Sequence, residues 1–322
     1  MKKVLKVLGF AVLAIAIVAT AAIIYVNNAF PKVDPAIELT VNSTPELVAR
    51  GEYLANHVAV CIDCHSTRDF SLYSGPPMDG TLGKGGDKFD QSMGMPGVFY
   101  AKNITPYGIS RYTDGELYRV ITTGVTKEGH ALFPIMPYPY YGQMDPEDIQ
   151  AIIAYLRTLP SIESDIPDAE PDFPFSIILK TIPQNANPQK RPDQTDIIAY
   201  GKYMATFSGC AECHTPVEKG QIIPEKMFSG GREFPMPGGL LRTPNITPHN
   251  TGMGAWTEDM FIARFKGYEN SRQPVAMGEF NTLMPWNMYA GMDTTDLKAI
   301  FAYLQSVEPI ENEVTRFEPA GE

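Results

Sequence analysis

The feature that most constrains this chain is a pattern of residues that occurs twice, about 148 positions apart. Cys61 and Cys210 lie 149 positions apart, and Met136 and Met284 lie 148 apart. Two other landmarks repeat in the same order: Asn-Ile-Thr-Pro begins at Asn103 and Asn245, and Ala-Tyr-Leu begins at Ala154 and Ala302. Because four landmarks at almost one offset indicate an internal repeat, we expect two copies of one structural unit.

Each copy is expected to open and close with a helix. Thr44 and Pro45 form a typical N-cap and first helical residue at the start of the first copy. Two closing helices are marked by apolar residues at helical spacing: Ile149, Ile152, Ile153 and Leu156, and then Leu297, Ile300, Phe301 and Leu304. The loops between are rich in Gly and Pro and show no sustained alternation of period two. The predicted fold class is therefore all-α, with β-sheet a minor component at most.

The N-terminus carries a membrane signal. The run Val7–Val26 is uncharged and 20 residues long, the length that a helix needs to cross a hydrocarbon core of roughly 30 Å. Lysines precede this run, which predicts a cytoplasmic N-terminus and export of everything after Asn27. A cleaved signal peptide is the alternative, with Ala19 and Ala21 as a cleavage site, but the apolar run continues beyond them.

These patterns predict six segments along the 322 residues. They are a transmembrane anchor or signal (1–27), a tether (28–43), a first domain (44–160), a linker (161–192), a second domain (193–310) and a tail (311–322).

All four cysteines of the chain lie in two Cys-x-x-Cys-His motifs, one in each copy. Two thiols at this spacing can form thioether bonds with the vinyl groups of a haem, and the adjacent histidine then ligates the iron. The sequence therefore predicts two haem c groups, held by Cys61, Cys64, Cys210 and Cys213 and ligated by His65 and His214. A thioredoxin-like pair would need a βαβ context, and a zinc site shared between the two motifs would leave the two histidines unexplained.

The repeat narrows the second axial ligand to two matched pairs of methionines, Met136 with Met284 and Met144 with Met292. The aspartate after each of Met144 and Met292 is a good N-cap for a closing helix, so packing against that helix explains these two methionines. Met136 and Met284 precede prolines, which disfavour helix and give a stiff loop that can present a sulfur to iron. We therefore expect Met136 and Met284 as the axial ligands. Three other histidines lack a partner at the same repeat position and are expected to be structural or exposed: His57, His130 and His249.

Aromatic residues follow both candidate methionines and could form the walls of a haem pocket, although they could equally be ordinary core residues. They are Tyr138, Tyr140, Tyr141, Trp286 and Tyr289. The loops at Asn103 and Asn245 could donate hydrogen bonds to haem propionates or could stabilise their own turns.

In this order, the motifs resemble class I cytochrome c twice over, across residues 44–159 and 193–307. Asn-Ile-Thr-Pro, Met-Pro-Tyr and Asp-Ile-Gln-Ala-Ile-Ile-Ala-Tyr-Leu are similar to segments in the cytochrome subunits of membrane-bound alcohol and sugar-acid dehydrogenases. Such subunits pass electrons from a catalytic subunit toward quinone or an oxidase, and usually carry three haem motifs, whereas this chain has two. The resemblance also implies that Gly51 and Gly201 allow each opening helix to approach its closing helix closely.

The predicted function is electron transfer by two haems with His/Met ligation, as a relay tethered to the bacterial inner membrane by one helix, with the haem domains on the periplasmic side. The expected partners are a dehydrogenase catalytic subunit, a quinol-oxidising complex or a terminal oxidase. The alternatives are an assembly subunit with idle haems, or a haem enzyme such as a dihaem peroxidase or a thiosulfate-type oxidoreductase, which would need an open position on one iron. The net charge of −11 excludes a nucleic-acid partner.

Overall fold

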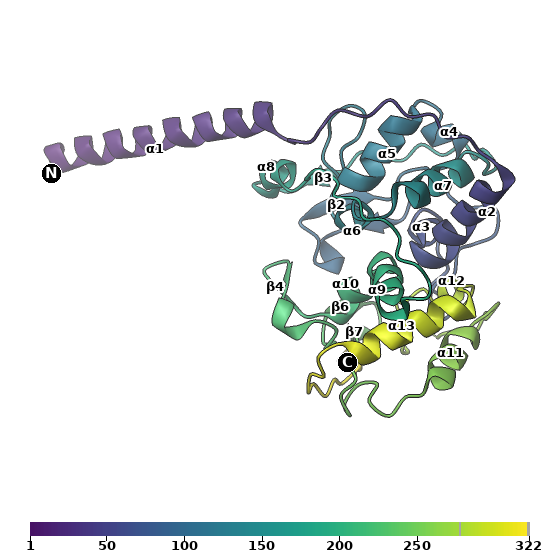
Figure 1. Ribbon diagram of the computed structural model, residues 1–322. Coiled ribbons are helices and arrows are strands. Elements are labelled where there is room, and N and C mark those ends of the chain that lie inside the picture. Colours follow the sequence, from purple (N-terminus) through teal and green to yellow (C-terminus); the bar gives the residue numbers. More distant parts are fainter. Residues whose placement is uncertain (277, 321–322) are drawn as a thin grey trace.

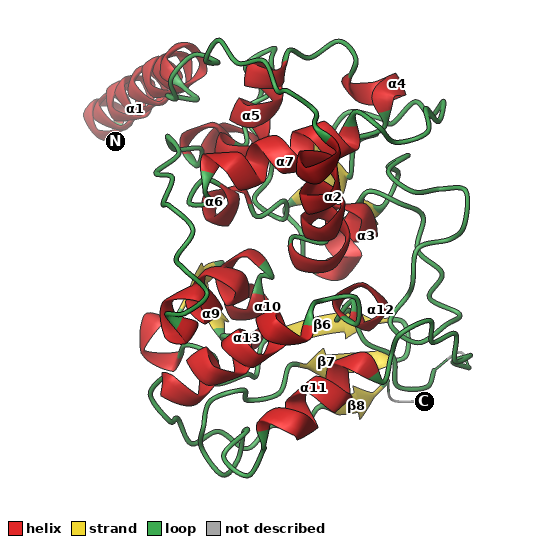
Figure 2. Cartoon of the chain, turned by 45° about the vertical axis from the view of Figure 1, so that its right-hand side comes forward, coloured by secondary structure: helices red, strands yellow, loops and turns green. Residues whose placement is uncertain are grey.

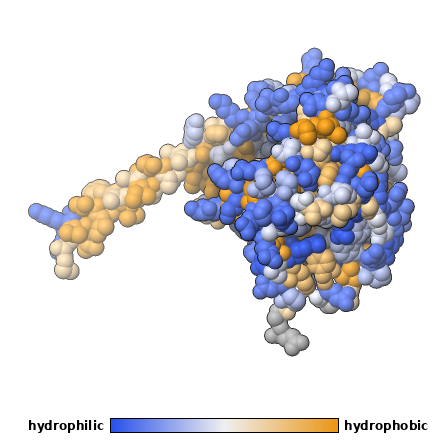
Figure 3. All heavy atoms as spheres, turned by 60° about the horizontal axis from the view of Figure 1, so that its bottom comes forward, coloured by the Kyte–Doolittle hydropathy of each residue, from blue (hydrophilic) through white to orange (hydrophobic). Residues whose placement is uncertain are grey.

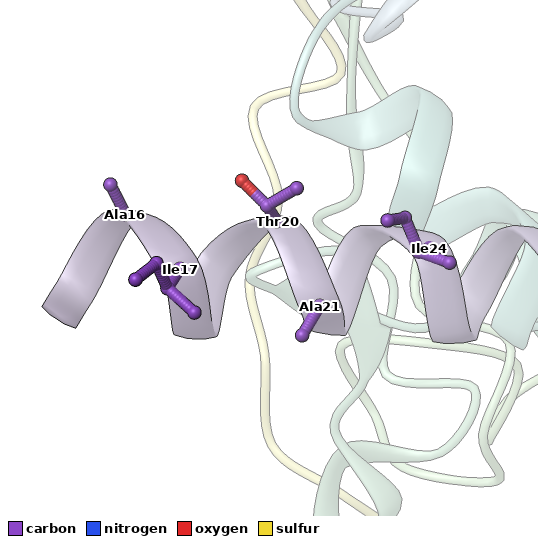
Figure 4. A pocket seen from close by; sticks show the side chains of 5 residues that line it. All are labelled: Ala16, Ile17, Thr20, Ala21 and Ile24. Atoms are coloured by element: carbon purple, nitrogen blue, oxygen red, sulfur yellow. The ribbon is translucent and has the colours of Figure 1, made fainter. Parts of the chain in front are cut away.

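The computed structural model describes residues 1–276 and 278–320. Its first helix, α1 (Lys2–Ala29), projects from the body and has no buried residue (Figure 1). An 18-residue window of α1 has a mean hydropathy of 2.8, so the helix is long and apolar enough to cross a membrane. Figure 4 shows five of its side chains on the helix surface: Ala16, Ile17, Thr20, Ala21 and Ile24.

Each copy of the repeat is built on a crossing of its opening and closing helices. In the first copy α2 (Pro45–Tyr53) packs on α7 (Pro146–Leu156), and in the second α9 (Ile197–Phe207) packs on α13 (Thr294–Ser306). A Cβ atom added at Gly51 would lie 1.8 Å from the carbonyl oxygen of Ala151, and one at Gly201 would lie 1.9 Å from that of Ala299. Since real Cβ contacts below 3.0 Å essentially do not occur, the predicted close approach is confirmed at both crossings.

The helix N-caps predicted from the sequence are present in the structure, with one exception. Thr44 Oγ1 accepts a hydrogen bond from the N–H of Leu47 at 3.3 Å, and Asp145 Oδ1 accepts one from the N–H of Glu147 at 2.9 Å. Asp293 occupies the N-cap position of α13, but its side chain makes no capping hydrogen bond.

The opening helix of the first copy contains an irregularity that the second copy lacks. After α2 the chain forms a π-helix, η1 (Leu54–Val58), before the first cysteine motif in α3 (Cys61–Cys64). In the second copy α9 leads to α10 (Cys210–His214) through two residues. Gly51 and Cys61 are ten positions apart, whereas Gly201 and Cys210 are nine apart. Because a π-turn widens one turn of a helix, η1 accommodates the additional residue.

The described residues form eight short strands in addition to the helices, so the all-α prediction holds only in part. The first antiparallel sheet contains β1 (Lys88–Phe89), β2 (Gly97–Tyr100) and β3 (Glu170–Pro171). A hairpin contains β4 (Val217–Glu218) and β5 (Gln221–Ile222), and a third sheet contains β6 (Glu233–Met236), β7 (Gly239–Arg242) and β8 (Phe317–Pro319) (Figure 2). At two to four residues each, these strands are too short to give a visible alternation.

Short helices complete the described part of the chain. They are α4 (Pro106–Ile109), α5 (Asp114–Thr123), α6 (Tyr138–Tyr141), α8 (Phe175–Ile178), α11 (Glu258–Lys266) and α12 (Trp286–Tyr289), with 3-10 turns η2 (Gln91–Met93), η3 (Leu179–Thr181) and η4 (Pro224–Lys226). Buried residues of both copies belong to one continuous hydrophobic core.

The two copies exchange equivalent hydrogen bonds. The hydroxyl of Tyr53, in the first copy, donates to Asp296 of the second, and the hydroxyl of Tyr203 donates to Asp148 of the first at 2.6 Å. Each of these hydroxyls also accepts a backbone N–H at 3.1 Å, from Asp293 and Asp145 respectively. Since Tyr53 corresponds to Tyr203 in the repeat, and Asp148 to Asp296, the contact is reciprocal.

Candidate haem-binding sites

The four motif cysteines form no disulfide bonds with one another. Burial raises the pKa of Cys61, Cys64 and Cys210 to about 12. A redox-active cysteine pair instead needs a thiolate with a lowered pKa, so the surroundings of these thiols do not favour that chemistry. Among the described residues no three His, Cys, Asp or Glu side chains come together to hold a metal ion, so the two motifs do not form one shared zinc site.

Both motif histidines are oriented by a backbone carbonyl. Nδ1 of His65 lies 2.6 Å from the carbonyl oxygen of Lys102, and Nδ1 of His214 lies 2.9 Å from that of Pro244. An Nδ1–H that donates to this carbonyl leaves Nε2 as the atom that can bind a metal. Burial lowers the pKa of both rings, which keeps them neutral, as ligation requires. The donor set of both copies therefore fits a haem iron.

The carbonyls that hold the histidines directly precede the two Asn-Ile-Thr-Pro segments. Oδ1 of Asn103 accepts the N–H of Thr105 at 2.9 Å, and its Nδ2 donates to the carbonyl of Ile162 at 2.8 Å. Asn245 makes the same two bonds, to the N–H of Thr247 and the carbonyl of Ile310. Each asparagine side chain thus joins its own turn to a backbone carbonyl, 59 positions further along the chain in the first copy and 65 in the second.

The candidate methionines lie in loops, each followed by a short helix that bonds to the segment before a cysteine motif. Met136 and Met284 are half-buried at the edge of the core, each in the loop that precedes a short helix, α6 or α12. The hydroxyl of Tyr141 donates to the carbonyl of Ala59 at 2.8 Å, two residues before Cys61. In the second copy Tyr289 donates to the carbonyl of Ser208, two residues before Cys210. The short helix after each methionine is thus bonded to the segment just before the cysteine motif of its own copy.

The other matched methionines belong to the core. Met144 and Met292 are each 1% exposed. They belong to the same hydrophobic core as the closing-helix residues Ile149 and Leu297. Both side chains are thus core residues, the position that the sequence predicts for methionines that pack on the closing helices.

The remaining histidines have other surroundings. Nδ1 of His57 lies 2.7 Å from the carbonyl oxygen of Met288, and its ring lies so close to Gly291 that a Cβ there would be 2.1 Å away. His249 Nδ1 pairs with the hydroxyl of Thr251 at 2.9 Å, and His130 is exposed.

One contact at the second site has no counterpart at the first among the described residues. The hydroxyl of Ser74, in the first copy, donates to the carbonyl of Met284 at 2.6 Å and accepts the N–H of Trp286 at 2.8 Å. The N–H of Ser74 donates to Oδ1 of Asn281 at 2.9 Å. Sequence reasoning missed these residues because neither Ser74 nor Asn281 occupies a repeated position.

The acidic residues inside the two motifs also differ. Asp63 is 3% exposed, its Oδ2 lies 3.4 Å from Arg68, and its Oδ1 has no hydrogen-bond partner. Burial raises the pKa of Asp63 to about 6. Glu212, at the matching position, accepts a hydrogen bond from Tyr140 of the first copy at 2.7 Å and pairs with Arg232 at 3.1 Å.

Comparison with known proteins agrees with this geometry. Residues 198–308 match the cytochrome c family model. The chain is 29% identical over 298 residues to the cytochrome c subunit of the quinone alcohol dehydrogenase of Gluconacetobacter polyoxogenes, covering 85% of this chain and 59% of that protein. It is 30% identical over 283 residues to the gluconate 2-dehydrogenase cytochrome c subunit of Pantoea cypripedii, covering 81% and 59%. A diheme cytochrome c-type protein of Cereibacter sphaeroides is 29% identical over 314 residues, covering 93% and 97%.

The matched region spans less than two thirds of the dehydrogenase subunits but almost all of the diheme protein. Residues 198–308 thus form a domain of the cytochrome c family. The chain is therefore a protein with a cytochrome c domain, similar along most of its length to the cytochrome c subunits of alcohol and gluconate dehydrogenases and to a diheme cytochrome c.

Proposed function

We propose that this chain carries two covalently bound haems, one in each of two tandem cytochrome c domains, and relays electrons between redox proteins. The observation that supports this most strongly is that both copies repeat one arrangement. In each, a backbone carbonyl holds Nδ1 of the motif histidine. In each, a tyrosine hydroxyl also joins the short helix after the methionine to the segment just before the cysteine motif. The proposed thioether residues are Cys61, Cys64, Cys210 and Cys213, and the proposed iron ligands are His65 with Met136 and His214 with Met284.

When bound, haem c supplies reversible one-electron exchange at its iron. The residues of the chain set the conditions for that exchange. The carbonyls of Lys102 and Pro244 fix the ring orientation of the two histidines and increase the basicity of Nε2. The thioether of Met136 or Met284, if bound to the iron together with the histidine, would raise its potential and leave no position for a substrate. Buried aromatic rings, Tyr138 and Trp286 among them, limit the access of water.

The partner and location follow from the relatives and from α1. The relatives named as dehydrogenase cytochrome subunits make a dehydrogenase catalytic subunit the proposed electron donor. The proposed acceptors are quinone, a quinol-oxidising complex or a terminal oxidase. We place α1 across the bacterial inner membrane, with residues 44–160 and 193–310 on the periplasmic side.

The haem assignment is tested by potentiometric titration of the purified, haem-loaded chain, together with its haem-to-protein ratio. We expect two haems per chain. Replacement of Met136 or Met284 by alanine should lower one midpoint potential and leave the other nearly unchanged. The matched controls are Met144→Ala and Met292→Ala, which should lower stability without moving either potential. A ratio of one haem per chain, or a potential that moves with Met144 and not with Met136, would refute the assignment.

The partner is tested separately by mild detergent extraction of native membranes with the chain tagged, followed by mass spectrometry of co-purifying proteins. Recovery of a dehydrogenase catalytic subunit would support the proposed donor. Recovery of oxidase or quinol-oxidising components alone would contradict that donor and leave the electron relay in place.

A further inference from the structure

The segment between the two copies exposes apolar side chains that the candidate haem sites do not use. Phe173, just before α8, is 76% exposed, and Ile178, the last residue of α8, is 50% exposed. Phe175 and Ile177 between them are partly exposed, while Leu179 is 5% exposed and belongs to the buried side of the segment. The segment therefore turns one side inward and presents large apolar groups on the other.

This exposed segment lies against the end of α1. Helix α8 and the following turn η3 both contact α1, and Nζ of Lys180 donates to Oδ1 of Asn27 at 2.7 Å. Figure 1 shows α8 near the C-terminal end of α1, on the side of the body from which α1 projects. Asn27 follows the last residue of the apolar run Val7–Val26. If that run fills the hydrocarbon core, Asn27 and Lys180 lie at the level of the lipid headgroups.

We propose that Phe173 and Ile178 insert into the boundary between headgroups and acyl chains beside α1, as a second contact between the protein and the bilayer. This inference rests on the anchoring of α1 that is part of the proposed function. An apolar group at this depth leaves water while the ammonium of Lys180 stays among the headgroups. Each inserted side chain should favour the docked orientation by about tenfold. The body would then be held at one orientation to the membrane instead of turning freely on the tether that follows α1.

The test uses the full, haem-loaded chain in nanodiscs of phosphatidylethanolamine and phosphatidylglycerol. With the native cysteines bonded to haem, a cysteine introduced as Ile178→Cys carries a single nitroxide label, measured with the irons reduced. The readout is the collision rate of the label with oxygen, which concentrates in lipid, against that with a water-soluble nickel chelate. The matched control is Met260→Cys on α11, also 50% exposed but on the opposite side of the body from α1 (Figure 1).

We expect the ratio of oxygen to nickel collisions to be several-fold higher at position 178 than at position 260. Equal ratios would overturn the proposal. Low collision rates with both reagents at position 178 would also overturn it, because they would show that the protein itself covers the segment. A third label, at Ile15→Cys in α1, distinguishes a failure of the proposed docking contact from a failure of the proposed membrane anchor. If position 15 lies in lipid and position 178 in water, the docking proposal alone is wrong; if both lie in water, the anchor fails as well. The potentiometric test of the haems is independent of either outcome.

The surface around this segment contains polar groups as well as apolar ones. Figure 3 shows the apolar surface of α1 meeting a body of mixed polarity, so the proposed contact is local and does not extend over a whole face.

Discussion

Replacement of Ser74 by alanine tests whether the first copy positions the axial methionine of the second. Ser74 is 1% exposed, and its hydroxyl both donates to the carbonyl of Met284 and accepts the N–H of Trp286. These two bonds fix the backbone on both sides of Pro285, between the proposed ligand and helix α12. Alanine would remove both bonds and leave the buried N–H of Trp286 without this acceptor.

The magnitude follows from the two bonds. The N–H of Trp286 keeps a second acceptor, the carbonyl of Met284 at 2.8 Å, so the substitution removes two hydrogen bonds and leaves this donor satisfied. A lost hydrogen bond costs about 0.5–1.5 kcal/mol, and we therefore expect Ser74→Ala to lower the free energy of unfolding by about 1–3 kcal/mol. Ser74 has a φ of +73°, a conformation that glycine adopts without strain. Ser74→Gly removes the same hydroxyl but relieves this strain, and should be less destabilised by about 1 kcal/mol.

The assay is a redox titration that also follows the sulfur-to-iron charge-transfer absorption band, carried out in a Met136→Ala background. In that background the remaining sulfur-ligated iron is the second one, so the band reports Met284 alone. We expect both Ser74 variants to weaken the band and to lower the midpoint potential of the second haem to a similar extent, despite their different stabilities. An unchanged band and potential in both variants would refute the positioning role and leave Ser74 a purely structural residue.

Three further predictions concern packing and charge. Gly201→Ala places a Cβ 1.9 Å from the carbonyl oxygen of Ala299. We expect the resulting overpacking to lower the free energy of unfolding by about 1–3 kcal/mol, after any gain in helix propensity. An unchanged denaturation midpoint would contradict the close approach of the two helices. Asp148 is 1% exposed and is hydrogen-bonded to two arginines and a tyrosine. Because these arginines are partly exposed, Asp148→Asn should lower the free energy of unfolding, measured by chemical denaturation, by about 2–3 kcal/mol. A loss near zero would argue against this network. Burial raises the pKa of Asp87 from 3.8 to about 6, so the contribution of this group to stability is lost as the pH rises from about 4 through 6. The unfolding free energy of Asp87→Asn relative to wild type should therefore grow over this range, and a constant difference would contradict the shift.

The local part of this structure could be predicted because its signals are local. Thr44 and Asp145 cap helices through bonds to residues two or three positions away, and the offset between copies identified the candidate ligands. The spacing of ten positions between Gly51 and Cys61, against nine in the second copy, also carried a signal for the π-helix η1, which we did not use.

The contacts between the two copies could not be predicted in the same way. Tyr53 reaches Asp296 across 243 positions of sequence, and Ser74 reaches Met284 across 210. Neither contact has a periodic signal, because each depends on how two folded units pack together. The short strands escaped prediction for a related reason, since β3 and β8 pair with strands far from them along the chain.

One ligand pattern repeated in two copies cannot by itself give two haems different potentials, because the proposed donor atoms and the carbonyl behind each histidine are the same. A difference has to come from the surroundings, through hydrogen bonding, burial and charge. The two sites differ in two such ways among the described residues. Ser74 holds the methionine loop of the second copy. Glu212, in the second motif, is paired with Arg232 and Tyr140, whereas Asp63, in the first motif, is buried with one oxygen that has no hydrogen-bond partner. We expect two distinct midpoint potentials, and a single unresolved transition for both haems would show that these differences have no electrostatic consequence at the irons.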